Sequence, residues 1–226
     1  MTHSASDATL SHLSSLAEQL IVAGRWISAR HWVPATGGNF SARLTQDTCL
    51  VTASGRDKGQ LTADDLLHLQ WQGSTLTSQG RPSAETLLHT QIYDLDSAAQ
   101  VAFHTHSVQS TVFSRLIETP SYRFHGYEMQ KAIEGNNSHT SELILPIVDN
   151  SQDMTALAHT LALRWQQEGP MPYAFLVRGH GMYAWGKDMQ SAKRHLEGWE
   201  FLIECELKRI QLTSLMTDTQ RAGNTL

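Results

Sequence analysis

Two histidines, His104 and His106, lie two residues apart in a stretch where apolar and polar residues alternate. Side chains at positions i and i+2 of a β-strand point to the same side, so both imidazoles could bind one metal ion. With 12 histidines among 226 residues, however, roughly 0.6 such pairs are expected by chance. The pair alone is therefore compatible with a metal site and equally with an ordinary strand that carries two histidines.

A third histidine and an acidic residue could complete such a site. His180 lies between two glycines in a predicted tight turn, from which a side chain can reach into a cleft. Glu85 lies near the start of a predicted helix. Three neutral imidazoles with an open coordination position are typical of catalytic zinc. Each residue also has an ordinary explanation, because His180 could bond to the backbone of its turn and Glu85 could be favoured by the helix dipole.

Small polar residues gather at predicted turns and at a helix start, where free backbone N–H groups can bind an anion. These residues are Gly38, Asn39, Ser54, Gly55 and Ser83. Arg56 and Lys58 follow closely enough to supply positive charge. The group could hold a phosphate, although ordinary turn chemistry explains the same residue types without a ligand.

Glu128 is an acidic residue in a segment rich in aromatic side chains, with Phe124 and Tyr127 close by in the sequence. Such surroundings could raise the pKa of its carboxyl group and make it a general acid or base. A solvated loop residue is the simpler alternative.

The elements that must position these residues are short strands and helices. Predicted strands cover residues 40–44, 49–52, 66–71, 99–106, 143–148, 173–177 and 182–185. Predicted helices cover residues 13–27, 82–95, 107–116, 154–165 with Ser151 as its cap, and 192–210, followed by a polar tail after about residue 212. Pro146 predicts an edge strand or a bend. Because the strands come in hairpin-like groups, we expect an α/β fold with a mostly antiparallel sheet covered by helices.

No internal repeat, low-complexity tract or linker stands out, which predicts a single domain over residues 1–226. The composition is that of a globular protein and excludes several other classes. The net charge of −5, with no basic cluster, argues against a nucleic-acid surface. No apolar run approaches 18 residues and the N-terminus does not resemble a signal peptide, so no membrane association is expected. Cys49 and Cys205 make no disulfide framework, which favours a reducing, cytoplasmic environment. No glycine-rich nucleotide loop occurs.

Five short motifs, taken in order, resemble the class II aldolase/adducin family. They are Gly-Asn at 38–39, Thr-Ala-Ser-Gly at 52–55, Pro-Ser-Ala-Glu at 82–85, His-Thr-His at 104–106 and Gly-His-Gly at 179–181. The resemblance covers about residues 10–212, and five ordered motifs are far more specific than any one of them. Within the family, residues 81–89 together with Glu128 and Met129 are most similar to dehydratases that act on a ketose phosphate in methionine salvage.

The resemblance implies a three-layer α/β/α domain and a homotetramer with active sites near its subunit interfaces. It implies one zinc ion per subunit, bound by His104, His106 and His180. It assigns phosphate binding to Gly38, Asn39, Ser54, Gly55 and Ser83, with Lys58 as an addition. Glu128 matches the acid–base residue of the dehydratases, and Glu85 matches the glutamate that aldolases use at zinc, so the division of roles between the two acids stays open.

The implied reaction, catalysed by a zinc-dependent hydro-lyase, removes a proton beside a ketone and expels hydroxide from the next carbon. Zinc would polarise the carbonyl, and Glu128 would take the proton and return it to the leaving hydroxyl. Alternatives are a sugar-phosphate aldolase that works through Glu85, a pentulose-phosphate epimerase, and a non-catalytic binding module like the adducin head. Imidazoles also accept iron, nickel or manganese.

Overall fold

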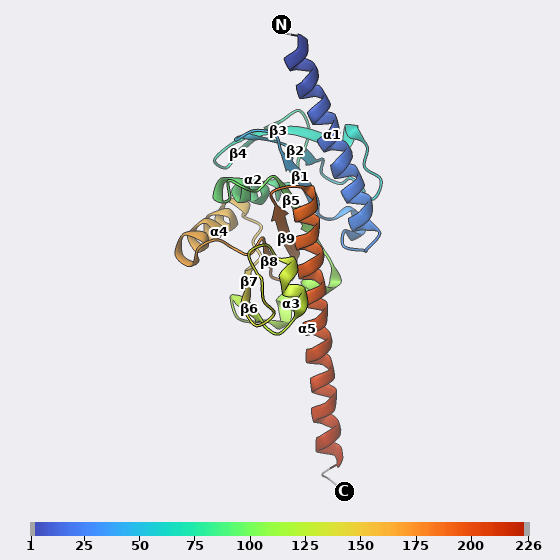
Figure 1. Cartoon of the computed structure of the whole chain (residues 1–226), viewed down its shortest axis with the longest axis vertical. Helices are drawn as coiled ribbons and strands as arrows, with labels where there is room; N and C mark the ends of the chain where they lie inside the picture. Colours follow the sequence, from blue (N-terminus) through green and yellow to red (C-terminus); the bar gives the residue numbers. More distant parts are fainter. Residues whose placement is uncertain (1–2, 224–226) are drawn as a thin grey trace.

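The computed structural model describes residues 3–223, and its strands form a single sheet in the order β4-β3-β2-β1-β5-β9-β8-β7-β6 (Figure 1). The strands are β1 Asn39–Arg43, β2 Thr48–Thr52, β3 Leu66–Gln72, β4 Thr75–Ser78, β5 Val101–Thr105, β6 Ser121–Phe124, β7 Leu143–Val148, β8 Ala174–Val177 and β9 Gly181–Gly186. Only β7 and β8 pair in parallel; the other pairs are antiparallel. The predicted α/β fold with a mostly antiparallel sheet is confirmed.

Helices cover both faces of the sheet and make three layers. They are α1 His3–Ser28, α2 Thr86–Leu95, α3 Val108–Leu116, α4 Met154–Glu168 and α5 Met189–Gly223. Phe103 of β5 packs in a core with residues of α1, α3 and α5, whereas its neighbour Ala102 packs in a second core with residues of α2 and α4. This alternation puts the side chain of His104 on the α2 side of the sheet.

Several predicted boundaries are wrong. The second helix begins at Thr86 rather than residue 82, because Pro82 forms an isolated bridge with Ala53. Asp153, not Ser151, caps α4 by accepting a hydrogen bond from the Ala156 amide. Pro146 lies in β7, which is not an edge strand, because β6 pairs with it and forms the edge of the sheet.

The two chain ends also differ from the prediction. The expected tail after residue 212 is helical, because α5 continues to Gly223 and leaves the body of the protein (Figure 1). The outermost residues of the predicted 1–226 domain, 1–2 and 224–226, lie outside the described part. No helix of the described residues is long and apolar enough to cross a membrane.

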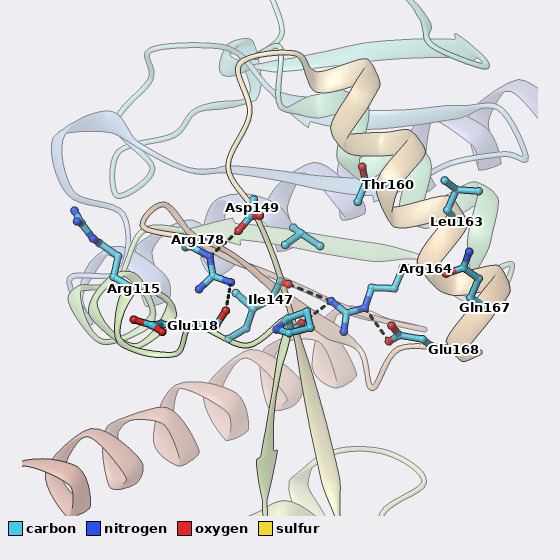
Figure 2. A pocket seen from close by; sticks show the side chains of 12 residues that line it. Arg115, Glu118, Ile147, Asp149, Thr160, Leu163, Arg164, Gln167, Glu168 and Arg178 are labelled. Carbon is cyan, nitrogen blue, oxygen red and sulfur yellow. Dashed lines mark hydrogen bonds and ion pairs between the residues drawn. The ribbon is translucent and has the colours of Figure 1, made fainter.

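Arg178 ties the turn between β8 and β9 to the end of α3. Its guanidinium donates to the Asp149 carboxylate at 2.7 Å (Figure 2). It also donates to the carbonyls of Ser114, at 2.8 Å, and Ile117. It lines a hollow of about 720 Å³ between α3, α4 and the end of β7. Since Arg178 lies two residues before His180, these bonds hold the turn that carries this histidine.

Candidate metal centre and active site

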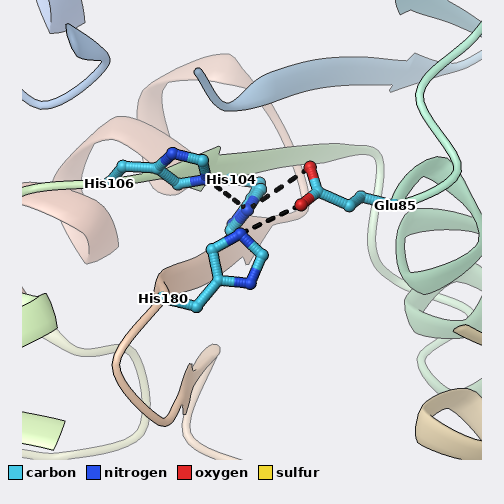
Figure 3. Close-up of side chains that lie close together, drawn as sticks. All are labelled: Glu85, His104, His106 and His180. Atoms are coloured by element: carbon cyan, nitrogen blue, oxygen red, sulfur yellow. Dashed lines mark hydrogen bonds and ion pairs between the residues drawn. The ribbon is translucent and has the colours of Figure 1, made fainter. Parts of the chain in front are cut away.

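Four side chains from separate segments meet at one point (Figure 3). His104 lies near the end of β5 and His106 just beyond it, His180 lies in the β8–β9 turn, and Glu85 directly precedes α2. One potential ligand atom from each residue lies within 4.8 Å of the others. Pairing of β5 with β9 brings the two strand ends together, because Thr105 lies opposite Met182.

The ring of His104 is held so that one nitrogen faces the other three residues. Its Nδ1 lies 3.0 Å from the carbonyl oxygen of Met182, and because that oxygen can only accept, Nδ1 carries the proton. Tyr183 stacks on the ring with centroids 4.0 Å apart. The Nε2 lone pair of His104 is therefore available to a metal ion.

The four ligand atoms form a donor set that suits a transition metal. Nε2 of His106 lies 2.8 Å from Nε2 of His104, and Nε2 of His180 lies 2.9 Å from a Glu85 oxygen. Burial lowers the pKa of His104 and of His106, which keeps both imidazoles neutral, the form that binds metals. Three imidazole nitrogens with a carboxylate oxygen fit zinc or another divalent transition metal.

The group is partly exposed. His104 is fully buried, whereas the side chains of His180 and Glu85 are 19% and 23% exposed. The group is therefore partly accessible to solvent.

Glu85 is ionised in these surroundings. Burial opposes its ionisation, but the hydrogen bond from His180 and the electrostatic interaction with the three neighbouring histidines prevail and lower the pKa of the carboxyl group to about 2. One carboxylate oxygen also accepts from the Asn39 amide at 3.1 Å and from the Ser83 hydroxyl at 3.3 Å. Two residues predicted to bind phosphate thus support the acid beside the histidines.

The other predicted phosphate-binding residues lie in turns joined to the same region. The Ser54 amide donates to the carbonyl of Arg81 at 3.0 Å, which places its turn beside the segment that carries Ser83. Gly55 has a φ of +74° and open space around its Cα. A Cβ on Gly38, whose φ is +72°, would lie 2.4 Å from the carbonyl oxygen of His104. Gly38 therefore permits a close contact with the strand that holds two of the histidines.

Lys58 connects two of these turns. Its ammonium group is buried and donates to the carbonyls of Thr36 at 2.7 Å and Arg56 at 2.6 Å. Burial lowers the pKa of Lys58 to about 8, against the charges of Asp57 and Glu85. An ammonium group has three donors, so one N–H remains after these two bonds.

Glu128 is not part of this group. It is exposed, and its carboxylate contacts Lys131 at 2.6 Å and His139 at 3.6 Å. The prediction of a raised pKa is wrong, because the hydrogen bond from Lys131 lowers the pKa of Glu128. Glu128 follows β6, which lies three strand positions, or roughly 14 Å, from β9.

The segment that presents Glu128 is nevertheless firmly held. The hydroxyls of Tyr127 and Tyr122 donate to the carboxylate of Glu206 on α5 at 2.6 and 2.7 Å. Arg209 donates to the same carboxylate at 2.9 Å. Sequence reasoning missed Glu206 and Arg178, because neither lies in a motif and their partners are distant in the sequence.

Known proteins resemble the chain over most of its length. Residues 18–207 match the family described as Class II Aldolase and Adducin N-terminal domain. A methylthioribulose-1-phosphate dehydratase of Yersinia enterocolitica is 50% identical over 190 residues, which are 84% of this chain and 90% of that protein. The same enzyme of Enterobacter sp. is 46% identical over 196 residues, 87% of this chain and 96% of its own length.

A solved structure shares the fold at lower identity. The L-fuculose-1-phosphate aldolase of Thermus thermophilus superposes with a TM-score of 0.69 at 22% identity, and the match covers 90% of this chain and 98% of that one. The extent of the family match and the identity to the two dehydratases lead to one conclusion. The chain belongs to the class II aldolase and adducin family.

Proposed function

We propose that the protein is a dehydratase that converts 5-methylthioribulose 1-phosphate to 2,3-diketo-5-methylthiopentyl 1-phosphate in methionine salvage. The observation that carries the proposal is the convergence of three imidazole nitrogens and the Glu85 carboxylate on one point. The identity of 46–50% to methylthioribulose-1-phosphate dehydratases supports this substrate.

The proposed cofactor is zinc, one ion per subunit, held by His104, His106 and His180. When bound, zinc polarises the substrate ketone and stabilises the negative charge that develops on its oxygen. The Met182 carbonyl supports this assignment, because it fixes the proton of His104 on the nitrogen that faces away from the ion. Glu85 is either a further ligand or an acid–base residue beside the ion.

The phosphate is proposed to bind at the turns of Gly38, Asn39, Ser54, Gly55 and Ser83. Lys58 supplies positive charge and its remaining N–H. Holding the phosphate fixes which substrate hydrogen faces the base, and this orientation lowers the entropic part of the barrier.

Glu128 is proposed to take the proton from carbon 3 and to deliver it to the hydroxyl that leaves carbon 4. Within one subunit Glu128 lies on the surface, outside the histidine group. We therefore place Glu128 in the site of a neighbouring subunit of a homotetramer. Moving into that site would separate the carboxylate from Lys131 and raise its pKa toward the range of a general acid. Two free thiols, Cys49 and Cys205, support action in the cytoplasm.

The test is to incubate the zinc-loaded protein with 5-methylthioribulose 1-phosphate and to follow the product by mass spectrometry. We expect loss of one water, abolished by a chelator and restored by added zinc. His106→Ala should lose both zinc and turnover, whereas His125→Ala, a histidine outside the group, should keep both. Release of dihydroxyacetone phosphate would instead indicate an aldolase working through Glu85, and an unchanged molecular formula would indicate an epimerase.

A further inference from the structure

Glu200, a buried acid on α5, forms hydrogen bonds with the first turn of α3. The carboxylate of Glu200 accepts hydrogen bonds from the hydroxyl of Ser107 at 2.8 Å and from that of Ser110 at 3.0 Å, one on each oxygen. Ser107 is also the N-cap of α3, because its oxygen accepts from the Ser110 amide at 3.0 Å. Burial raises the pKa of Glu200 to about 7, while the two serine hydroxyls favour the charged form.

Helix α3, which Glu200 holds, is joined to His106 and contacts the turn of His180. Ser107 directly follows His106, so the first turn of α3 determines where this histidine leaves β5. Along the same helix, the Thr111 hydroxyl donates to the His180 carbonyl at 3.1 Å. One turn further, the Ser114 hydroxyl accepts from the Gly179 amide at 2.9 Å. A rotation of α3 would therefore displace His106 and His180 together.

Burying a carboxylate costs desolvation free energy, and apolar residues of similar size generally stabilise a core as well or better. The presence of a carboxylate at this position is therefore best explained by the direction of the hydrogen bonds that it accepts. Two hydrogen bonds, one to each oxygen, fix both the position and the rotation of the first helical turn.

We propose that Glu200 is a positioning residue for the metal centre, which acts through α3 to set the positions of His106 and His180. The inference rests on the proposed metal-binding function, and it assigns no contact between Glu200 and the substrate. It also explains why two serines are buried at the start of α3.

The experiment compares full-length wild-type protein with Glu200→Gln and Glu200→Ala. Zinc affinity is measured by competition with a chelating dye, and ligand geometry by the visible absorption of the cobalt-substituted protein. We expect 10- to 100-fold weaker zinc binding in Glu200→Ala, since loss of groups that orient metal ligands has effects of about this size. Glu200→Gln keeps one acceptor and should show a smaller loss, with a shifted cobalt spectrum in both variants.

Glu206→Gln is the matched control, because it removes another buried carboxylate of α5 that contacts Tyr122 and Tyr127 rather than α3. It should leave zinc affinity and the cobalt spectrum unchanged. Should Glu200→Ala fail to fold, Ser110→Ala removes one of the two donors and is expected to weaken zinc binding several-fold.

Unchanged zinc affinity and cobalt spectrum in folded Glu200 variants would overturn the proposal, and so would a wild-type protein that binds neither metal. A wild-type protein that binds zinc in a Glu200-dependent way but does not dehydrate the substrate would support the role of Glu200 and refute only the proposed reaction.

Discussion

His89, one helical turn after Glu85, is a fully buried imidazole outside the candidate metal centre. Its Nδ1 lies 2.7 Å from the Ser41 hydroxyl, which lies 2.6 Å from the hydroxyl of Tyr93. Burial lowers the pKa of His89 to about 3, against the charge of Glu85. The ring is therefore neutral in the folded protein at every pH where the protein is expected to work.

This depressed pKa makes the free energy of unfolding depend on pH. An unfolded histidine titrates near pH 6.5, so between about pH 6.5 and pH 3 the unfolded chain binds a proton that the folded chain does not. The contribution of His89 to the free energy of unfolding is therefore complete above pH 6.5 and decreases as the pH falls. We expect His89 alone to remove about 2 kcal/mol of stability between pH 6.5 and pH 5.

Urea unfolding at these two pH values, with zinc present, measures this effect. In His89→Gln the free energy of unfolding should decrease between pH 6.5 and pH 5 by about 2 kcal/mol less than in wild type, whatever the stability of the variant at pH 7. His125→Gln is the control and should show the same decrease as wild type. An equal loss in wild type and His89→Gln would contradict the assigned pKa.

The residues of the candidate metal centre differ in how far the sequence could predict them. His104 and His106 were predictable as a pair, because strand alternation alone puts them on one face. The support of Glu85 by Asn39 and Ser83 was not predictable, since it depends on the packing of three separate turns. The exposure of Glu128 and its contacts with Lys131 and His139 were missed because aromatic neighbours in the sequence do not cover its side chain.

At the level of elements, the approach of β9 to β5 depends on Gly181. A Cβ at this position would lie 2.0 Å from the carbonyl oxygen of Thr105 and 3.1 Å from the ring of His106. Gly181→Ala should therefore push the strands apart, destabilise the fold by about 1–3 kcal/mol and weaken zinc binding.

Thermal unfolding and zinc titration of Gly181→Ala test this expectation. Gly169→Ala is the control: its φ is +87° but nothing lies within 4 Å of the added Cβ, so it introduces only backbone strain and should keep its zinc affinity. Wild-type zinc affinity in Gly181→Ala would show that the spacing of these strands does not position the histidines.

The strands and helices themselves were predictable where their patterns were long. The alternation in β5 and the apolar spacing in α1 marked both elements. The four-residue strands β4 and β6 were missed, whereas the equally short β8 was predicted because it stands before the glycine-flanked turn of His180. The end of α5 was missed because its last residues are polar, although the helix continues beyond the body of the protein.

At the scale of the whole molecule, the position of Glu128 predicts active sites shared between subunits. Glu128→Gln and His106→Ala should each abolish turnover. If the acid acts in a neighbouring subunit, mixed oligomers contain some sites with an intact acid and intact histidines. Random mixing of equal amounts should restore roughly one quarter of wild-type activity, as expected when each site draws on two independently chosen subunits.

The measurement is activity after the two variants are denatured together and refolded, with each variant refolded alone as the control. Mixed oligomers that form but remain inactive would place Glu128 in the site of its own subunit. Turnover by Glu128→Gln alone would remove this residue from the mechanism.

The pairing of β5 with β9 also has a kinetic consequence. The strands are separated in the chain by helices α3 and α4 and strands β6 to β8, so the histidines meet only after this distant pairing has formed. Closing such a large loop is among the slow events of folding. Where this pairing forms after the folding barrier has been crossed, the binding free energy of a metal ion would slow unfolding and leave the rate of folding unchanged. Zinc would lengthen the lifetime of a native state that the chain must first reach without it.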